Sequence, residues 1–262
     1  MGLFLAEGER TVKQIVQNGQ LDIEAMIVGE SRLTEGTLAQ WPTLVSSKLF
    51  SASAEQIAQL SDTETPQEIV CICRIPKSAS LEDLARPLPS QTSNHLPVIL
   101  ALDAIQDPGN LGTILRSAAW FGVQGLFIGK GTVDLWNPKV IRSAVGGIAG
   151  TAIAEGNLQE ALVRLKELGC RVCTLELGEG AISLSHFSQT QMWEGEIKEV
   201  NPWIVVVGNE ANGVSEGVSA LSDVCVRIEG GAKDSVESLN AGVSVGIALY
   251  AIYEAALSKR KV

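Results

Sequence analysis

Three segments of the chain place polar side chains and glycines where a predicted strand ends or a predicted helix begins. The first covers Asp107–Arg116 and reads DPGNLGTILR. Asn110 can cap the helix that starts there, and Gly109 lets a ligand approach the backbone closely. Ligands of open α/β sheets bind at such carboxyl ends of strands. Arg116 follows six residues after Asn110, so the two side chains lie well apart around the helix. The segment is typical of a ligand-binding turn, or of an ordinary helix start with a solvated arginine.

The second segment, residues 205–215, reads VVVGNEANGVS. A buried strand leads into Gly208 and then into the acid Glu210, and the following Asn212-Gly213 is a turn dipeptide. Glu210 could simply cap a helix over residues 213–221. A carboxylate that follows a strand and a glycine turn is also well placed to face a ligand.

The third segment, residues 228–241, reads IEGGAKDSVESLNA and opens the last predicted helix with Ser238, Leu239 and Asn240. Free backbone N–H groups at a helix start, together with the helix dipole, favour a negatively charged group. Serine or asparagine there is also an ordinary helix cap. None of the three segments is a Rossmann G-x-G-x-x-G or a P-loop.

In this order and spacing, the three segments resemble the signature motifs of the SpoU (TrmH) family of RNA 2′-O-ribose methyltransferases. The matching patterns are N-x-G-x-x-x-R from Asn110, V-V-G-x-E-x-x-G-V-S from Val206 and S-L-N from Ser238, and the resemblance covers residues 97–257. The front of the chain, EGERTVKQIV followed by LSDTETPQEIV, resembles the ribosomal-protein-like substrate-binding domain of rRNA-modifying members.

The resemblance implies an α/β fold with a mostly parallel sheet and a deep trefoil knot near the C-terminus, which is a rare topology. S-adenosyl-L-methionine would be the cofactor, bent within the knot and contacted largely by backbone at Val207, Gly208, Ile228 and Leu239. Family members act as homodimers. Arg116 is expected to face the S-adenosylmethionine of the partner subunit.

The resemblance assigns the catalytic site to Asn110, Arg116, Glu210, Ser238 and Asn240. Methyl transfer to a 2′-hydroxyl is an in-line displacement, so the protein contributes positioning and handling of the proton. We expect the two asparagines and Ser238 to orient ribose and phosphate, and Glu210 to hold Asn110 or loop backbone in place.

Neither histidine, His95 nor His186, lies within a motif, so a histidine base is disfavoured. An arginine stays protonated near neutral pH and is a poor base. We therefore expect Arg116 to bind the neighbouring phosphate and to stabilise the developing alkoxide, with base action as the less favoured alternative. The general base and the modified nucleotide stay open at this point.

The basic residues Arg10, Lys139 and Arg142 are expected to contact RNA. The chain departs from the family at residues 142–146, which read RSAVG instead of R-A-S-M-G and place Ala144 at a family serine position. The loop 229–237 is longer than usual, and Glu229 replaces a proline. The resemblance also implies that relatives carry a helix before GLFLAEG.

Hydrophobic patterning divides the chain into a small α/β domain at 1–76, a linker at 77–95 and a catalytic domain at 96–262. The linker is rich in proline and small polar residues. After it, strands such as PVILALD, GVQGLFIG, CRVCTLEL and WIVVVG alternate with helices, of which the last is expected over 238–257. Such alternation predicts a parallel sheet with helices on both faces.

The net charge of −10 disfavours a simple nucleic-acid binder but not an enzyme whose basic residues line one cleft. Five cysteines is an odd number that disfavours a disulfide framework. Cys170 and Cys173 form a C-x-x-C inside a predicted strand with no second pair, so we expect neither a metal nor a redox centre. The sequence shows no uncharged apolar run of about 18 residues, so we expect a cytoplasmic protein and no membrane partner.

The front domain and the length favour structured rRNA, and a 23S rRNA guanosine in particular, as substrate over tRNA. A tRNA 2′-O-methyltransferase remains an alternative, as does a non-catalytic RNA-binding or ribosome-assembly protein on the same fold. A nicotinamide enzyme is disfavoured because the first strand of the large domain lacks a glycine fingerprint.

Overall fold

The computed structural model describes residues 2–33, 48–89, 95–178, 180–193, 199–231 and 237–260. The chain forms two compact units, of which unit 1 comprises Met1–Lys77 with Asp134–Gly150, and unit 2 comprises Ser78–Val133 with Thr151–Val262. The first segment of unit 1 ends at Lys77, whereas the front domain was expected to end at residue 76. Residues 134–150 were expected in the catalytic domain, but they pack with unit 1.

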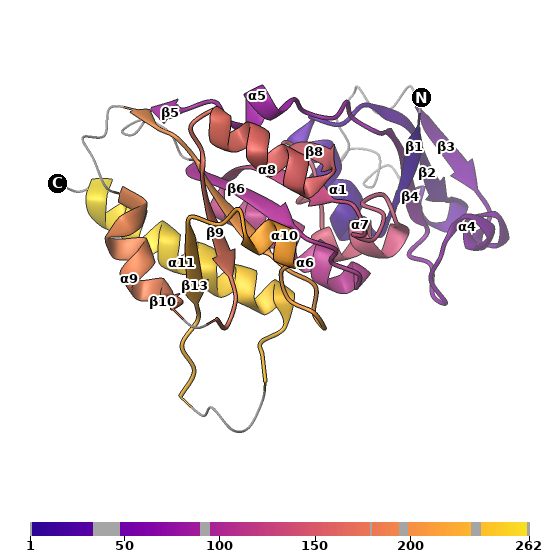
Figure 1. Ribbon diagram of the computed structural model, residues 1–262. Helices are drawn as coiled ribbons and strands as arrows, with labels where there is room; N and C mark the ends of the chain where they lie inside the picture. Colours follow the sequence, from indigo (N-terminus) through magenta and orange to yellow (C-terminus); the bar gives the residue numbers. More distant parts are fainter. Residues whose placement is uncertain are drawn as a thin grey trace. The chain divides into compact units, whose positions relative to one another are not determined.

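Unit 1 is built on a four-stranded sheet in the order β1-β4-β2-β3, shown in Figure 1. Strands β1 and β2 run antiparallel to β4, and β3 runs parallel to β2. The α/β character of this region was expected, whereas β1 and β3 were not anticipated because short apolar runs carry little periodicity. The elements are β1 (Leu3–Glu7), α1 (Glu9–Asn18), β2 (Ile23–Gly29), the 3₁₀ turn η1 (Glu30–Arg32), β3 (Leu49–Ala52), α4 (Ala54–Leu60) and β4 (Ile69–Arg74).

Helix α7 (Pro138–Ala144) completes unit 1 by packing against β1 and α1. Asn137 caps it by accepting the backbone N–H of Lys139 at 2.9 Å, and Pro138 fills the first turn, as predicted. The helix ends at Val145, whose φ of 47° is unusual for a β-branched residue. Gly146 lies so close to α1 that a Cβ there would come within 2.6 Å of Gln14 Cβ. Close packing with unit 1 is thus possible only without a side chain at this position.

Unit 2 contains a seven-stranded sheet in the order β10-β13-β9-β12-β6-β7-β8. All of its neighbouring strands are parallel. Every residue of β6 and of β12 is buried, in agreement with the continuous apolar runs. The strands are β6 (Leu96–Leu102), β7 (Val123–Gly129), β8 (Ala152–Gly156), β9 (Arg171–Leu175), β10 (Ile182–Ser183), β12 (Trp203–Val207) and β13 (Val224–Arg227).

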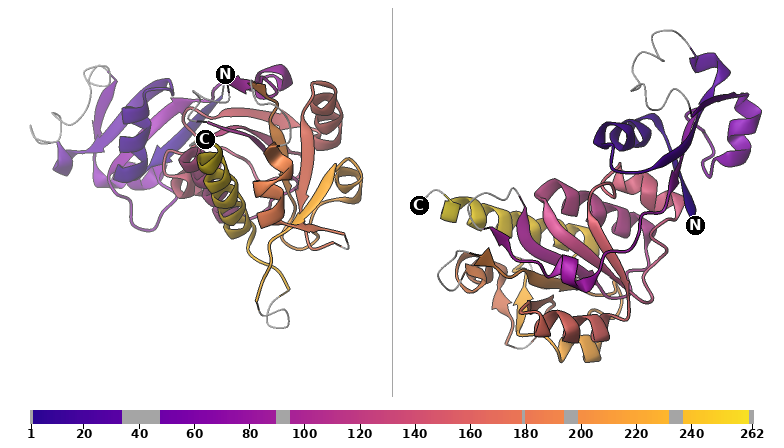
Figure 2. Two further views of the ribbon diagram at one scale, coloured as in Figure 1. Left: turned by 90° about the vertical axis from the view of Figure 1, so that its left-hand side faces the viewer. Right: turned by 90° about the horizontal axis from the view of Figure 1, so that it is seen from above.

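Helices cover both faces of this sheet, and Figure 2 shows α6 and α11 on one side with α8 and α10 on the other. Alternate strand residues serve the two faces: Ile99 and Ala101 of β6 pack in one core cluster with Leu162 of α8. The helices are α5 (Leu81–Leu84), α6 (Pro108–Phe121), α8 (Leu158–Glu167), α9 (Leu184–Gln189), the 3₁₀ turn η2 (Gln191–Trp193), α10 (Glu216–Ser219) and α11 (Ala241–Arg260).

The predicted linker is more ordered than its composition suggested. Ser80 caps α5 by accepting the N–H of Asp83 at 3.1 Å, and Leu84 is fully buried in unit 2. Gly125 of β7 leaves room for it, because a Cβ there would come within 2.4 Å of the Leu84 side chain. The short strands β5 (Leu88–Pro89) and β11 (Glu199–Val200) then pair antiparallel. A four-residue helix is too short to show periodicity, which is why the pattern missed it; residues 90–94 lie outside the described residues.

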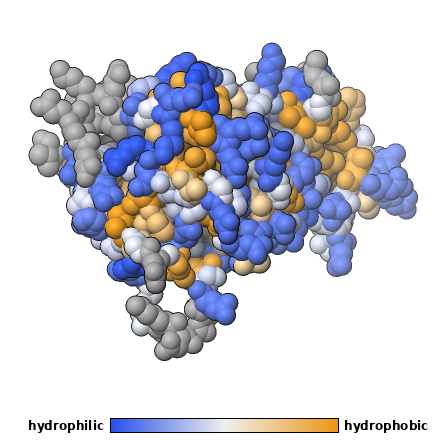
Figure 3. All heavy atoms as spheres, in the orientation of Figure 1, coloured by the Kyte–Doolittle hydropathy of each residue, from blue (hydrophilic) through white to orange (hydrophobic). Residues whose placement is uncertain are grey.

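Helix α11 is apolar on every side. By length and composition alone this helix could cross a membrane. The sequence did not indicate this, because Glu254 interrupts the uncharged run. It nevertheless packs in unit 2 against α6 and α9, with Val245 and Leu249 fully buried. Its opposite side exposes Val243, Ile247 and Tyr250. Elsewhere the surface is mixed, and Figure 3 shows hydrophobic patches separated by hydrophilic residues.

Candidate active site

The sheet order of unit 2 reverses next to β6. From β6 the chain builds β7 and β8 to one side, and it later places β12, β9 and β13 on the other side. Strands β6 and β12 are parallel neighbours, with Leu102 opposite Val207. The segments that follow them therefore leave the same edge of the sheet side by side. Such a reversal point at the carboxyl ends of strands is where open α/β sheets bind ligands.

Helices α6 and α11 bring the first and third segments together. A Cβ on Gly242 would lie 3.0 Å from Thr113 Cγ2, and four residues further along each helix a Cβ on Gly246 would lie 4.0 Å from Ser117 Oγ. The next matching pair is Phe121 and Tyr250, whose ring centroids are 6.5 Å apart. The equal spacing shows that the two helices run parallel with their N-termini together. Small residues at the contact allow this close approach.

A chain of hydrogen bonds joins the three segments at this point. Asn110 donates its side-chain Nδ2 to Glu210 Oε1 at 2.7 Å, and Asn240 donates its Nδ2 to Asn110 Oδ1 at 2.7 Å. The remaining oxygen of Asn240 accepts the N–H of Val243 at 3.2 Å, which caps α11. The predicted helix start at 238 is thus shifted to Ala241. An ionised carboxylate only accepts hydrogen bonds, so Glu210 fixes the orientation of both amides in turn.

Three side chains that support this arrangement were not expected from the sequence. Asp107 caps α6 by accepting the N–H of Asn110 at 2.7 Å, so the expectation that Asn110 itself caps the helix was wrong. Asn209 donates to the carbonyl of Ala104 at 2.9 Å and accepts the N–H of Ala211 at 2.9 Å. Asp103 accepts the N–H of Ser215 at 2.7 Å. Only Asp107 carried a recognisable signal, an acidic cap followed by proline at the first helical position.

Gly208 is required for a reason that differs from the expected one. We expected a glycine there because a ligand approaches the backbone. In the structure, a Cβ on Gly208 would lie 2.1 Å from the carbonyl carbon of Gly213 and 2.2 Å from the N atom of Val214. The loop that carries Glu210 therefore folds back onto Gly208, and no other residue fits.

Apolar side chains near the same edge of the sheet are left partly in solvent. Leu239 is 46% exposed and Ile228 is half-buried, while Val207 is buried at the end of β12. Leu177 follows β9, the neighbour of β13, and is 67% exposed. Large apolar groups exposed around a ligand edge fit an adenosyl group that would cover them. Leu177 is a candidate that sequence reasoning did not single out. Residues 232–236 of the long loop lie outside the described residues.

Arg116 and Ser238 are not part of the hydrogen-bond chain. Both are exposed, and neither side chain makes a hydrogen bond or ion pair within the described part of the chain. Arg116 lies on α6, about 9 Å along the helix from Asn110. Both side chains are therefore free to meet a ligand.

The three basic residues expected to contact RNA all belong to unit 1. Arg10 is exposed in the first turn of α1, and Lys139 is exposed in the first turn of α7. Arg142 pairs with the buried carboxylate of Glu7 on β1.

The cysteines have the properties of core residues. Cys170 and Cys173 are both buried, and burial raises the pKa of Cys170 to about 11. Among the described residues, no group of three or more His, Cys, Asp or Glu side chains could hold a metal ion.

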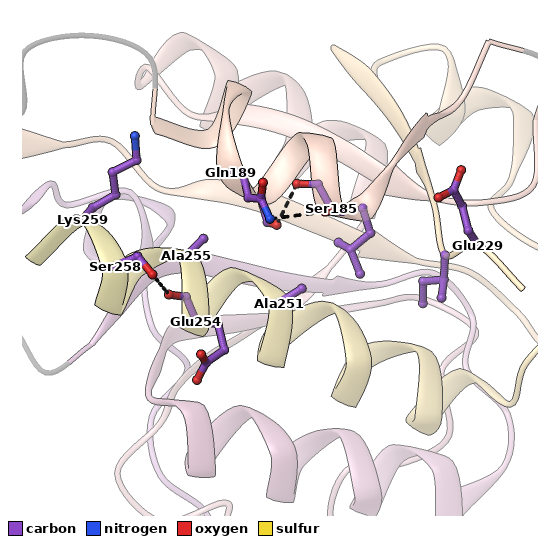
Figure 4. Close-up of a pocket in the computed structure, with 11 residues that line it drawn as sticks. Ser185, Gln189, Glu229, Ala251, Glu254, Ala255, Ser258 and Lys259 are labelled. Carbon is purple, nitrogen blue, oxygen red and sulfur yellow. Dashed lines mark hydrogen bonds between the residues drawn. The ribbon is translucent and has the colours of Figure 1, made fainter.

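A cavity of about 690 Å³ opens between α9 and α11 (Figure 4). Its walls include Ser185 and Gln189 from α9 and Ala251 and Glu254 from α11. Ala251 lies ten residues beyond the start of α11, about 15 Å along the helix from Asn240. None of the hydrogen-bonded site residues lines this cavity, but Ile228, which was expected to contact the cofactor, does. The hydrogen-bonded residues themselves lie at the edge of the sheet.

Comparison with known proteins assigns both parts of the chain. Residues 97–250 match the model described as the SpoU rRNA Methylase family, and residues 1–71 match the MRM3-like substrate binding domain. The chain is 29% identical over 247 residues to the 23S rRNA (guanosine(2553)-2′-O)-methyltransferase RlmP of Bacillus subtilis, which covers 94% of this chain and 87% of that protein. It is 30% identical over 251 residues to an uncharacterized tRNA/rRNA methyltransferase of Synechocystis, covering 89% and 84%.

Solved structures share the fold. A putative RNA methyltransferase of the TrmH family from Porphyromonas gingivalis is 25% identical with a TM-score of 0.72, covering 95% of this chain and 89% of that one. The methyltransferase AviRb from Streptomyces viridochromogenes, in complex with AdoMet, has a TM-score of 0.76 over 98% and 92% of the two chains. Its identity is 21%, so the likeness concerns the fold alone.

Proposed function

Because the chain belongs to the SpoU rRNA methylase family, we propose that it methylates the 2′-hydroxyl of a guanosine ribose in 23S rRNA. The chain is an RNA methyltransferase that uses S-adenosyl-L-methionine, as do the relatives to which it is similar. The observation that carries the proposal is the hydrogen-bond chain from Glu210 through Asn110 to Asn240. It joins all three motifs at the reversal point of the sheet.

When bound, S-adenosyl-L-methionine would supply a methyl group on a positively charged sulfur, for transfer to the ribose 2′-oxygen with cleavage of the carbon–sulfur bond and release of the hydroxyl proton. Asn110, Asn240 and Ser238 hydrogen-bond ribose and phosphate and hold the 2′-oxygen in line. Arg116 binds the adjacent phosphate and stabilises negative charge that develops on the oxygen. Glu210 acts through Asn110 and is a positioning residue.

Val207, Gly208, Ile228 and Leu239 would hold the cofactor. Their backbone groups would meet its polar parts, and the half-buried side chain of Ile228 and the exposed side chain of Leu239 would cover its apolar parts. The chain between β12 and α11 threads to form a trefoil knot. These statements are supported by the motif positions at the strand ends and by the shared fold.

The active form is a homodimer. The proposed dimer is supported by a stripe of exposed apolar side chains on α11, formed by Val243, Ile247 and Tyr250. Trp120 of α6 is 81% exposed in the same unit. A second copy would bury these side chains and would place Arg116 against the cofactor of the partner subunit.

Unit 1 binds the structured RNA, with Arg10, Lys139 and Arg142 as contacts. This proposal is supported by the match of residues 1–71 to the MRM3-like substrate binding domain. The protein works in the cytoplasm, where rRNA is available.

Methyl transfer to a 23S rRNA transcript from S-adenosyl-L-[methyl-³H]methionine tests the function directly. Mapping of 2′-O-methyl groups should then find one labelled guanosine ribose. Label on a base, label on tRNA in preference to rRNA, or no transfer despite cofactor binding would contradict the proposal.

A further inference from the structure

Unit 1 contains a polar cavity of about 340 Å³ that has no part in the proposed methyl transfer. It lies where the end of β1, the start of α1 and the end of α7 meet the segment before β4. Its walls are formed by Glu7, Gly8, Arg10, Thr11, Thr63, Thr65, Gln67, Arg142 and Val145. The volume falls at the small end of the ~300–1,000 Å³ typical of ligand pockets. A duplex cannot enter, but one nucleotide can.

Thr11 adds a hydroxyl to the wall of this cavity. The residue as a whole is only 5% exposed, and its hydroxyl makes no hydrogen bond within the described residues. The hydroxyl is not among the fully buried side-chain atoms that lack a partner, so it faces the open space of the cavity. It can therefore donate to or accept from a bound molecule without first breaking a bond within the protein.

Two arginines make the cavity suitable for an anion. Arg142 is held by the buried carboxylate of Glu7, which also accepts a hydrogen bond from the Ser61 hydroxyl. A guanidinium has five N–H donors, so this ion pair fixes Arg142 without using all of them. Arg10 makes no ion pair in the described part of the chain. Glu7 is thus neutralised within the protein, and Arg10 leaves the cavity with an uncompensated positive charge.

We propose that this polar cavity binds one unstacked nucleotide of the substrate RNA, with its phosphate between Arg10 and Arg142 and its sugar or base on Thr11, Thr63 and Thr65. The inference rests on the proposed function, which makes RNA the ligand of unit 1. Guanidinium groups pair with phosphate and stack on bases, and threonine hydroxyls both donate and accept. Because the whole chain carries a net charge of −10, general attraction to phosphate is weak and recognition depends on such built sites.

Filter binding of a 23S rRNA transcript to the full chain without cofactor tests the proposal. Arg10→Ala should weaken binding about 5- to 20-fold. It should also remove about one phosphate contact, which lowers the slope of log K against log salt concentration by ~0.7 for a single strand. Thr11→Val has the same shape without the hydroxyl. It should weaken binding several-fold without changing the salt slope.

Arg164→Ala is the matched control, because it removes the same charge from α8 in unit 2, where Arg164 pairs with Glu82 and Glu167. It should bind RNA like the original chain. The proposal is overturned if Arg10→Ala and Thr11→Val bind with unchanged affinity, or if Arg164→Ala loses as much. Melting temperatures of all variants show whether a loss reflects unfolding.

Cross-linking adds a readout that a structural role would not give. RNA transcribed with 4-thiouridine should cross-link to peptides that contain Arg10 or Thr63, and cross-links found only elsewhere would refute the site. Two different results would refute the nucleotide site and the proposed function. If the chain methylates rRNA and the cavity variants have the same KM for rRNA as the original chain, the cavity does not bind RNA. If the chain binds rRNA through the cavity but does not methylate it, the proposed function is wrong.

Discussion

Asn110 donates its side-chain amide to Glu210 at 2.7 Å, although the two residues are 100 positions apart in the chain. The bond ties the loop after β12 to the start of α6, and through Asn110 it sets the orientation of Asn240 at the start of α11. Because a carboxylate can only accept, the network has one orientation. The two amides are therefore organised before any ligand arrives.

Replacing Glu210 with glutamine should disturb this orientation, because a glutamine amide can also turn and donate. We expect kcat to fall about 10- to 100-fold, as misplacement of about 1 Å costs on that scale, while affinity for S-adenosyl-L-methionine changes little. Glu216→Gln removes the same charge from the exposed first turn of α10 and should keep full activity. Steady-state kinetics with cofactor titration would check this, and equal losses in both variants would count against a positioning role.

Arg116→Ala should leave cofactor affinity nearly intact and lower turnover about 10²-fold or more, because Arg116 acts on the RNA and on developing charge. Arg116→Lys should restore little, since a point charge does not reproduce the planar fork of arginine. Calorimetric cofactor binding measured beside RNA methylation would decide. A parallel loss of binding and activity in Arg116→Ala would show that the division of roles is wrong.

Gly208→Ala should destabilise the fold, because the added Cβ overlaps the backbone of residues 213 and 214. We expect a loss of about 3 kcal/mol or more, at the upper end of the cost of overpacking. Gly230→Ala is the matched control, since a Cβ there meets nothing within 4 Å. Thermal unfolding of the two variants without cofactor should separate them, and similar melting temperatures would contradict the close approach.

Val243→Glu should convert the dimer into monomers and abolish activity if the α11 stripe is the subunit interface. Val163→Glu on α8 provides the control, because Val163 is 47% exposed and Val243 is 48% exposed in the chain. Light scattering at assay concentration measures the outcome. An active monomer, or dissociation by both substitutions, would exclude this interface.

Asp223 should make stability depend on acid pH. Burial by itself raises the pKa of Asp223, but hydrogen bonds from Lys166 at 2.8 Å and from the Val172 N–H at 2.8 Å outweigh it and hold the pKa below its usual value. The carboxylate therefore stabilises the folded state above the ordinary aspartate pKa near ~4, and this contribution is lost as pH falls through the lowered value. Asp223→Asn should lose about 1–3 kcal/mol at pH 7 and show a weaker acid dependence in urea unfolding. An unchanged pH profile would contradict the assignment.

The sequence by itself determined the helices and strands that carry the motifs, because their patterns are local. The buried runs of β6 and β12 and the long apolar helix α11 follow from neighbouring residues alone, and the motif order identifies the family. The sequence also placed Asn110, Glu210 and Asn240 at element ends, where polar residues face ligands.

Only the tertiary structure decided which of these residues touch. The hydrogen bonds of Asn110 depend on parallel pairing of β6 with β12 and on small residues between α6 and α11, and contacts across more than a hundred residues leave no periodic signal. For the same reason, the order of residues could not show that α7 belongs to unit 1. It also could not show that Arg142 forms an ion pair with Glu7. The polar cavity likewise exists only because separate segments meet there, so the set of residues that lines it cannot be recognised in the sequence.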